Sequence, residues 1–210
     1  MFHEVYAEGE IPRDPQNAIA LARFSGLIDR LLKTKRFVRL DSYDAVLAMR
    51  DGDVALTFDD IYESSFRNAF PVLREREIPY TVFISTGLLD TTGYITKTEL
   101  DELKDDSLCT IGAHSVTHGL SRFAPKKTLW EAKESAELLS ARLYAFPYGS
   151  VYAVSWCNRR ALQASRLFSC AFSTLNCDLT DENKKLRFFL PRRGVNDEAL
   201  RREIYVRAKG

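Results

Sequence analysis

The chain has 210 residues, of which 45% are hydrophobic and 28% are charged, and its formal net charge is +1. This length and composition are typical of a globular chain with a substantial core, and they exclude a disordered or low-complexity chain. Because Lys and Arg are scattered and nearly balanced by acids, the charge offers no broad surface for nucleic acid or for an anionic membrane.

The chain also lacks the sequence features of membrane insertion and of a disulfide framework. No apolar run approaches the roughly 20 residues of a membrane-spanning helix, and residues 1–6 do not resemble a signal peptide. We therefore expect no transmembrane segment and a cytoplasmic location, with an extracytoplasmic one left open. The spacing of Cys109, Cys157, Cys170 and Cys177 does not require disulfides, so a reducing compartment is the simpler interpretation.

In the first half of the chain, the hydrophobic periodicity alternates between the periods of strands and helices. Apolar residues at helical spacing predict an amphipathic helix over residues 17–33. Asp41 or Ser42 can cap a second helix that runs to Met49, and Pro71 is expected to kink or restart a third. In chain order we expect a strand over residues 2–6, a helix over 17–33, a strand over 37–40, a helix up to 49, a strand over 54–58, a helix over 64–76 and a strand over 80–85.

The second half continues the alternation. Thr98 can cap a short helix through Lys104. We expect a helix over residues 98–104, a strand over 110–113, a helix over 127–143, a strand over 144–146, a helix over 154–165, strands over 171–174 and 187–190, and a helix over 197–207. With no repeat or linker-like stretch, this pattern predicts one α/β domain over residues 1–210 with a largely parallel sheet, either open or closed into a barrel.

Two motifs place metal-binding residue types just after predicted buried strands. Residues 57–60 read Thr-Phe-Asp-Asp, and residues 114–118 carry two of the three histidines of the chain, four positions apart. On a helical turn this spacing puts both imidazoles on one face. One carboxylate and two imidazoles suit a divalent metal, and the second carboxylate is then free to act as a base. Alone, the aspartates could instead cap a helix, and the histidines could be a cap and a surface residue.

With these two motifs and Pro147-Tyr148-Gly149, the chain resembles the polysaccharide deacetylases, the NodB-homology enzymes of carbohydrate esterase family four. The three motifs of that family correspond to residues 57–60, 114–118 and 147–149 here, and the resemblance extends from about Phe2 to Arg192. It implies a distorted (β/α) barrel with fewer than eight repeats.

The resemblance also implies a role for each motif residue. Asp59 would be the general base, and Asp60, His114 and His118 would hold one divalent ion. Zinc suits this ligand set, and nickel, cobalt and iron would also fit. The backbone N–H of Tyr148 would help to stabilise the oxyanion.

Two departures from the family pattern affect the expected site. The family has an Arg two residues before the Pro of the third motif, where this chain has Ala145. We expect Arg192 to orient the base in its place; the alternative is that Arg192 forms a structural ion pair. The family's C-terminal catalytic His is absent, but the chain resembles the circularly permuted poly-N-acetylglucosamine deacetylases, in which that residue lies near the N-terminus. His3 would then protonate the leaving amine at the rim of the metal site; alternatively it is an ordinary residue at a strand end.

These implied roles predict a metal-dependent hydrolase that removes N-acetyl groups from a polysaccharide or oligosaccharide. Pro147, Tyr148 and Tyr152 are the expected substrate contacts, whereas Trp130 is expected in the core. Two other functions stay open. A non-catalytic carbohydrate-binding protein is supported by the missing Arg and His but opposed by the retained Asp59, and an amidase for a small amide would require a closed pocket. The metal, the sugar linkage and the oligomeric state are not determined by the sequence.

Overall fold

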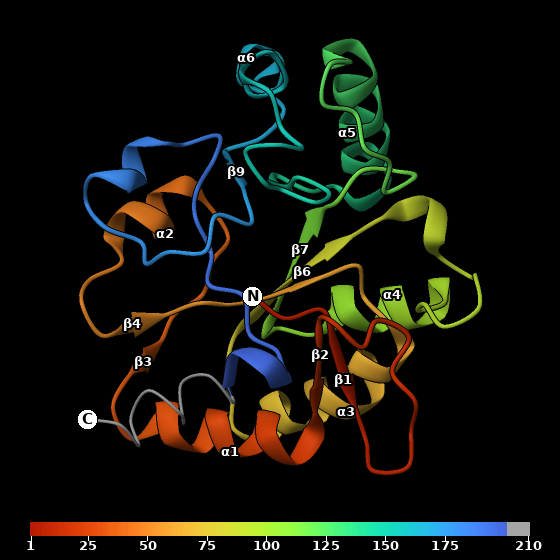
Figure 1. Cartoon of the computed structure of the whole chain (residues 1–210), viewed down its shortest axis with the longest axis vertical. Coiled ribbons are helices and arrows are strands. Elements are labelled where there is room, and N and C mark those ends of the chain that lie inside the picture. The colour runs from red at the N-terminus through yellow and green to blue at the C-terminus, as the bar shows by residue number, and fades with distance from the viewer. Residues whose placement is uncertain (201–210) are drawn as a thin grey trace.

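A curled sheet of five parallel strands forms the centre of the computed structural model, which describes residues 1–200 (Figure 1). Each strand pairs with the next one along the chain, so the sheet winds steadily in one direction. The predicted distorted (β/α) barrel with fewer than eight repeats is confirmed. In spatial order the strands are β5 (Leu56–Asp59), β6 (Tyr80–Ile84), β7 (Cys109–Ala113), β8 (Leu143–Ala145) and β9 (Cys170–Phe172).

Helices cover the outside of this sheet, and three of the six α-helices within residues 1–200 start at a polar side-chain cap. Ser42 accepts a hydrogen bond from the Ala45 N–H, as expected of a cap. The next cap is Thr96 rather than Thr98, because only Thr96 has a Glu three residues on to complete a capping box. The α-helices are α1 (Leu21–Leu32), α2 (Tyr43–Ala48), α3 (Glu63–Glu75), α4 (Lys97–Asp105), α5 (Pro125–Leu139) and α6 (Trp156–Ser165), and the 3₁₀ turns are η1 (Thr86–Leu88) and η2 (Asn183–Lys185).

Two short strand pairs flank the main sheet. β1 (Glu4–Tyr6) pairs in parallel with β2 (Ala18–Ala20), and β3 (Arg36–Phe37) pairs with β4 (Asp53–Val54). The helix expected from residue 17 therefore begins only at Leu21, because residues 18–20 gain sheet hydrogen bonds that a periodicity argument cannot foresee.

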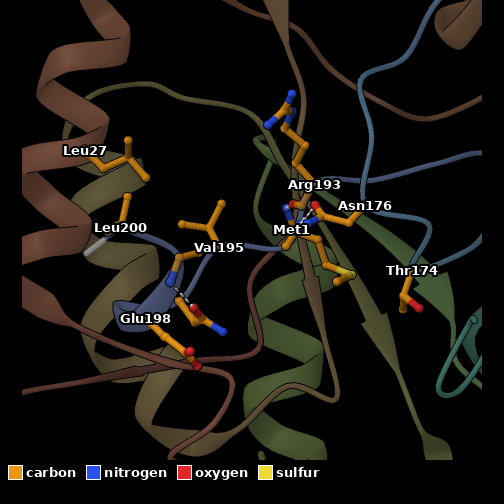
Figure 2. Close-up of a pocket in the computed structure, with 11 residues that line it drawn as sticks. Met1, Leu27, Thr174, Asn176, Arg193, Val195, Glu198 and Leu200 are labelled. Carbon is orange, nitrogen blue, oxygen red and sulfur yellow. Dashed lines mark hydrogen bonds between the residues drawn. The ribbon is translucent and has the colours of Figure 1, made fainter. Parts of the chain in front are cut away.

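The open side of the curled sheet is narrowed by segments from the two ends of the described chain. Phe2 bridges Phe58 of β5, and Leu190 bridges Phe172 of β9. The strand expected over residues 187–190 is thus reduced to one bridge. The N–H of Val195 donates to the Met1 carbonyl at 2.9 Å, so the two segments meet. A cleft of about 490 Å³ lies where they join (Figure 2).

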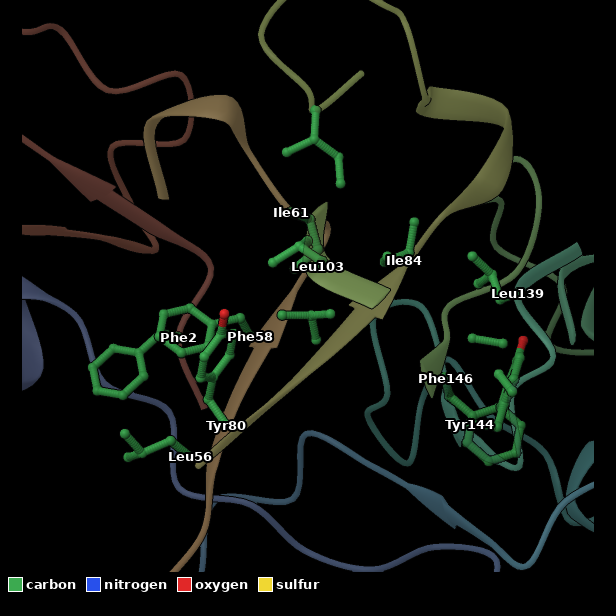
Figure 3. Close-up of a cluster of buried hydrophobic side chains, with 14 of the residues drawn as sticks. Phe2, Leu56, Phe58, Ile61, Tyr80, Ile84, Leu103, Leu139, Tyr144 and Phe146 are labelled. Atoms are coloured by element: carbon green, nitrogen blue, oxygen red, sulfur yellow. The ribbon is translucent and has the colours of Figure 1, made fainter. Parts of the chain in front are cut away.

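Side chains alternate between two hydrophobic clusters on opposite faces of the sheet. The outer cluster, between strands and helices, includes Phe2, Phe58 and Tyr80 (Figure 3). The inner cluster includes Phe83 and Phe172, whose ring centroids are 5.4 Å apart. A Cβ at position 112 would lie 2.4 Å from the Phe83 ring, so glycine is required there for the inner face to pack.

Two of the expected helices differ from those in the structure. Pro71 sits inside an uninterrupted α3, and two of its neighbours, Phe70 and Leu73, are fully buried. Such side chains contribute about 1.5–3 kcal/mol each, which offsets the roughly 3 kcal/mol cost of an internal proline. α5 ends at Leu139 rather than at residue 143, because Ser140 adopts a left-handed conformation.

The helix expected over residues 197–207 starts at 197, and its part beyond 200 lies outside the described residues. Within residues 1–200, every helix is too short or too polar to cross a membrane. All four cysteines are free.

Candidate metal centre and its neighbouring carboxylate

The first motif lies at a sharp turn after β5. Asp59 ends the strand, and both Asp60 and Ile61 have positive φ, at 66° and 54°. This left-handed pair reverses the chain immediately after the strand, which keeps both carboxylates at the carboxyl end of the sheet. Aspartate tolerates that conformation better than most residues.

The second motif follows β7, two strands away in the same sheet. The His114 side chain is 2% exposed, and its Nδ1 lies 2.8 Å from the Ala145 carbonyl oxygen. Because a carbonyl can only accept, Nδ1 carries the proton of the neutral ring, and Nε2 keeps its lone pair. That Nε2 lies 3.4 Å from Asp60 Oδ1.

His118 reaches the same carboxylate from a loop. Its Nε2 is 3.0 Å from Asp60 Oδ1. The expectation of a helical turn is wrong here: residues 114–118 are irregular, with φ of 67° at Ser115 and 53° at His118. The imidazoles converge because the loop folds back, with the Ser115 hydroxyl accepting from the His118 N–H at 3.0 Å. One ligand atom from each of Asp60, His114 and His118 lies within 4.8 Å of the others.

These three residues fit a divalent cation by their chemistry and by an unsatisfied atom. Asp60 Oδ1 is buried without a hydrogen-bond partner, although two ring nitrogens lie close to it. Burial acts to raise the pKa of Asp60, but His114 and His118 hold it well below its ordinary range, so the group is a carboxylate. A carboxylate with two imidazoles is a suitable ligand set for zinc and other borderline ions.

The neighbouring Asp59 is held by a buried arginine. Arg192 donates from Nη1 to Asp59 Oδ1 at 2.6 Å and from Nη2 to Oδ2 at 2.7 Å, while its Nε donates to the Ser173 carbonyl. Asp59 is 1% exposed and Arg192 7%. Burial acts to raise the pKa of Asp59, but the charges of Arg192 and His114 lower it below its ordinary value. Asp59 is therefore ionised at neutral pH.

His3 faces the same space because of strand register. Phe2 bridges Phe58 in parallel, and the two rings stack at 5.3 Å in the outer cluster. Since alternate residues face opposite sides of a strand, His3 and Asp59 both face inward. Burial lowers the pKa of His3, and the charges of Asp59 and Asp60 oppose that shift, so the ring lies within electrostatic reach of both carboxylates.

The third motif forms a tight turn after β8, beside His118. Tyr148 has φ of 58°, and its ring centroid is 4.8 Å from that of His118. A Cβ at Gly149 would lie 2.6 Å from the Thr174 nitrogen, so the turn requires glycine. Within residues 1–200, no acceptor pairs with the Tyr148 N–H.

Comparison with known proteins agrees with this geometry. The model of one family, described as polysaccharide deacetylase, matches residues 47–167, more than half of the chain. The chain belongs to the polysaccharide deacetylase family. The match includes strands β5 to β8 of the sheet and all three motifs, so the resemblance inferred from the sequence is confirmed.

Among curated proteins, this deacetylase-family chain is similar to the poly-beta-1,6-N-acetyl-D-glucosamine N-deacetylases of Staphylococcus epidermidis and Staphylococcus aureus. It is 29% identical to the first over 118 residues, which cover 47% of this chain and 41% of the relative. It is 30% identical to the second, over 46% of this chain and 40% of the relative. The chain thus spans about two fifths of the length of the curated relatives it matches.

Solved structures share the fold of this family member over nearly its whole length. IcaB from Ammonifex degensii superposes with a TM-score of 0.72 at 23% identity, over 94% of this chain and 92% of that one. The Streptococcus pyogenes deacetylase PplD in complex with acetate gives 0.76 at 20% identity, over 93% and 91%.

The substrate contacts expected from the sequence lie on an exposed edge of this polysaccharide deacetylase domain. Tyr148 is 56% exposed and Tyr152 77%, whereas Pro147 is half-buried. Trp130 is 55% exposed, so its expected place in the core is wrong. It lies on α5, whose buried positions are taken by smaller residues such as Ala132 and Ser135.

One buried residue beside the candidate metal ligands is not among the residues predicted from the sequence. Glu131 of α5 is 3% exposed and accepts two hydrogen bonds from Thr117, which lies between the two histidines. The sequence does contain one indication that Glu131 is buried. Glu131 lies on the same helix face as Thr128 and Ser135, and the other side chains of that face are small or apolar.

Proposed function

We propose that this chain is a metal-dependent deacetylase that removes N-acetyl groups from N-acetylhexosamine units of a polysaccharide. One juxtaposition carries the proposal. Asp59 is a buried carboxylate that is paired with Arg192. The next residue, Asp60, shares a potential metal site with the imidazoles of His114 and His118. A protein that only binds sugars needs no such base, whereas amide hydrolysis needs a proton acceptor beside an electrophilic centre.

The residues divide the chemistry between them. A divalent ion held by Asp60, His114 and His118 would polarise the acetyl carbonyl and acidify a water molecule. Asp59 would accept the proton of the attacking water, and Arg192 would keep its carboxylate oriented and ionised. The Tyr148 N–H, which has no acceptor within residues 1–200, would donate to the oxyanion that forms as the water adds.

The amine product leaves more readily once it is protonated, and His3 is the proposed donor. Its ring faces the carboxylate pair from the other strand, so an acetyl group bound between them could be approached from two sides. The lowered pKa of His3 makes its protonated ring a stronger acid. A distance of about 4–8 Å between its ring and the ion stays a prediction.

A polymeric substrate is proposed from the openness of the site and from its relatives. The side chain of His118 is 22% exposed, and Tyr148 and Tyr152 extend the rim outward. Exposed aromatic rings beside a site can pack on the apolar faces of successive sugars. Two similar curated proteins are named poly-beta-1,6-N-acetyl-D-glucosamine N-deacetylases, which makes that polymer the first substrate to test.

Acetate release from N-acetylglucosamine oligomers, measured before and after metal removal and zinc or cobalt addition, tests the proposal. We expect release that requires metal and increases with oligomer length. The variant His114→Ala should lose metal and turnover together, while His118→Ala should retain less metal than wild type. Release that is unaffected by chelation, or preference for a small non-sugar amide, would contradict the proposal.

A further inference from the structure

The loop that carries His118 has no regular secondary structure to hold it. Both Ser115 and His118 adopt the left-handed conformation, which residues with a Cβ rarely choose unless the surroundings impose it. His114, in contrast, directly follows β7, and its ring is fixed by the Ala145 carbonyl. The position of the second histidine therefore depends on what holds residues 115–118.

One side of the loop is held by backbone contacts to the turn after β6. The Thr86 N–H donates to the Ser115 carbonyl at 3.2 Å, and the Gly87 N–H donates to the Val116 carbonyl at 2.9 Å. A Cβ at position 87 would lie 2.7 Å from that carbonyl oxygen, so glycine permits the close approach. Within residues 1–200, no backbone hydrogen bond from that side reaches Thr117 or His118.

The other side is held by Glu131 of α5. Its Oε2 accepts from the Thr117 N–H at 3.1 Å, and its Oε1 accepts from the Thr117 hydroxyl at 2.8 Å. Glu131 also forms an ion pair with the exposed Lys127 on the same helix, whose Nζ lies 3.7 Å from Oε1. Burial acts to raise the pKa of Glu131, but the Thr117 N–H and hydroxyl lower it below its ordinary value, so the carboxylate accepts both bonds in its ionised form.

Glu131 is a buried carboxylate whose hydrogen bonds from Thr117 are shorter than its ion pair with the exposed Lys127, and this arrangement needs an explanation. Burying a charge is unfavourable unless hydrogen bonds compensate, and here most of the compensation comes from one residue between two metal-ligating positions. We propose that Glu131 is a positioning residue for the metal centre: through Thr117 it fixes residues 115–118 so that His118 Nε2 meets Asp60 and His114. This rests on the metal site in the proposed function.

Zinc affinity, rather than activity, is the direct test. Wild type and variants are stripped of metal and titrated with Zn²⁺ against a chromophoric chelator, and the visible spectrum of the Co²⁺ form reports ligand geometry. Glu131→Ala should weaken zinc binding about 10–100-fold, the usual range for residues that orient ligands. Glu131→Gln should recover most of this affinity, because its amide can still accept from the Thr117 N–H and donate to the hydroxyl.

Matched variants separate positioning from stability. Thr117→Val removes only the hydroxyl bond, at an exposed position, and should weaken zinc binding about 2–10-fold, as expected for one hydrogen bond. It also serves as the test if Glu131→Ala does not fold. Glu134→Ala, at an exposed position on the same helix, should bind zinc as wild type does. A general loss of structure would lower the melting temperature of the metal-free protein but leave the Co²⁺ spectrum of the folded fraction unchanged.

Two results would overturn the inference. If Glu131→Ala and Thr117→Val both bind zinc with wild-type affinity and give the wild-type Co²⁺ spectrum, Glu131 does not position the loop, and the proposed function is untouched. If the wild type itself binds no divalent ion, the metal site and this inference fail together.

Discussion

At the scale of single residues, the two adjacent aspartates differ because their surroundings differ. Asp59 receives two hydrogen bonds from Arg192, so both of its oxygens are already partnered by a cation. Asp60 has one oxygen without a hydrogen-bond partner, placed between two imidazole nitrogens. Asp59 is therefore held ionised and oriented, whereas Asp60 keeps one oxygen available to the proposed metal ion.

This difference predicts separable effects of substitution. Asp59→Asn should lower acetate release by about 10²–10⁴-fold, the range for loss of a general base. Zinc content should stay near that of wild type, because the ligand set of Asp60, His114 and His118 is intact. Metal analysis and turnover are measured on the same sample, with Asp60→Asn as the contrasting variant that loses metal. Full turnover in Asp59→Asn would place the base elsewhere.

Arg192 should matter for stability as well as for catalysis. Arg192→Met would leave Asp59 buried and unpaired, and breaking a buried pair costs about 3–5 kcal/mol. The neighbouring Arg193 offers a control, since its ion pair with Asp178 is largely exposed. Arg193→Met should cost about 0–1 kcal/mol. Urea unfolding distinguishes the two, and equal losses would show that the buried pair has no special role in stability.

The proposed role of His3 as proton donor can be tested by removing its ring. His3→Ala should lower turnover while leaving zinc affinity and the free energy of unfolding near those of wild type, because its ring is half-buried and no hydrogen bond to the ring is seen within residues 1–200. His3→Gln, which keeps polarity but cannot supply a proton, should behave like His3→Ala. Unchanged turnover in both would assign the proton donor to another group or to water.

At the scale of elements, the local sequence pattern predicts the position of a strand or helix where contacts with residues nearby in the sequence decide it. The ends of β5 to β8 lie within one or two residues of expectation, because apolar runs between polar turns are local features. The histidine loop was expected to be helical and is not, since its shape is set by Gly87 and Glu131 from other elements. Arg192 was a candidate partner for the base, but contact across 133 residues cannot be derived from spacing.

The junction of α4 with β7 gives a test of electrostatics away from the site. The Asp106 side chain, 10% exposed, accepts from Arg74 Nε at 2.7 Å, from the Tyr80 hydroxyl at 2.6 Å and from the Leu108 N–H at 2.8 Å. Burial acts to raise the pKa of Asp106, but the Tyr80 and Arg74 hydrogen bonds lower it below its ordinary value of 3.8. A depressed pKa means that the ionised group stabilises the fold above about pH 4 and loses this effect as pH falls through the folded-state pKa.

Asp106→Asn should therefore cost about 1–3 kcal/mol near neutral pH. The difference from wild type should shrink as the pH falls below 3.8, because the wild-type carboxylate is then protonated in the unfolded state and, at lower pH, in the folded state too. Urea unfolding across pH measures this. Asp105→Asn, at the exposed neighbouring position, should change stability by less than about 0.5 kcal/mol at every pH. A pH-independent cost at Asp106 would contradict the ionic origin.

At the scale of the whole molecule, the site depends on closure of the curled sheet. Its candidate metal ligands follow β5 and β7, whereas the arginine that holds Asp59 comes from the segment after Leu190, which lies beyond β9. That segment is fixed by the bridge of Leu190 to Phe172 and by the hydrogen bond of Val195 to Met1. Asp59, the proposed base, is thus paired with Arg192 only when the two edges of the sheet are brought together.

Leu190 links this closure to catalysis. Its side chain is fully buried in the inner cluster with Phe83 and Phe172. Leu190→Ala should cost about 2–5 kcal/mol through the cavity it leaves. Because Arg192 lies two residues on and donates to Asp59, loosening this segment should also lower turnover in the fully folded protein. These two effects are measured by unfolding in urea and by acetate release well below the melting temperature.

Leu186→Ala is the control, because Leu186 precedes Leu190 by four residues and is 45% exposed. It should change the free energy of unfolding and the turnover little. If Leu190→Ala were destabilised but fully active when folded, the orientation of Arg192 would not depend on closure of the sheet at Leu190.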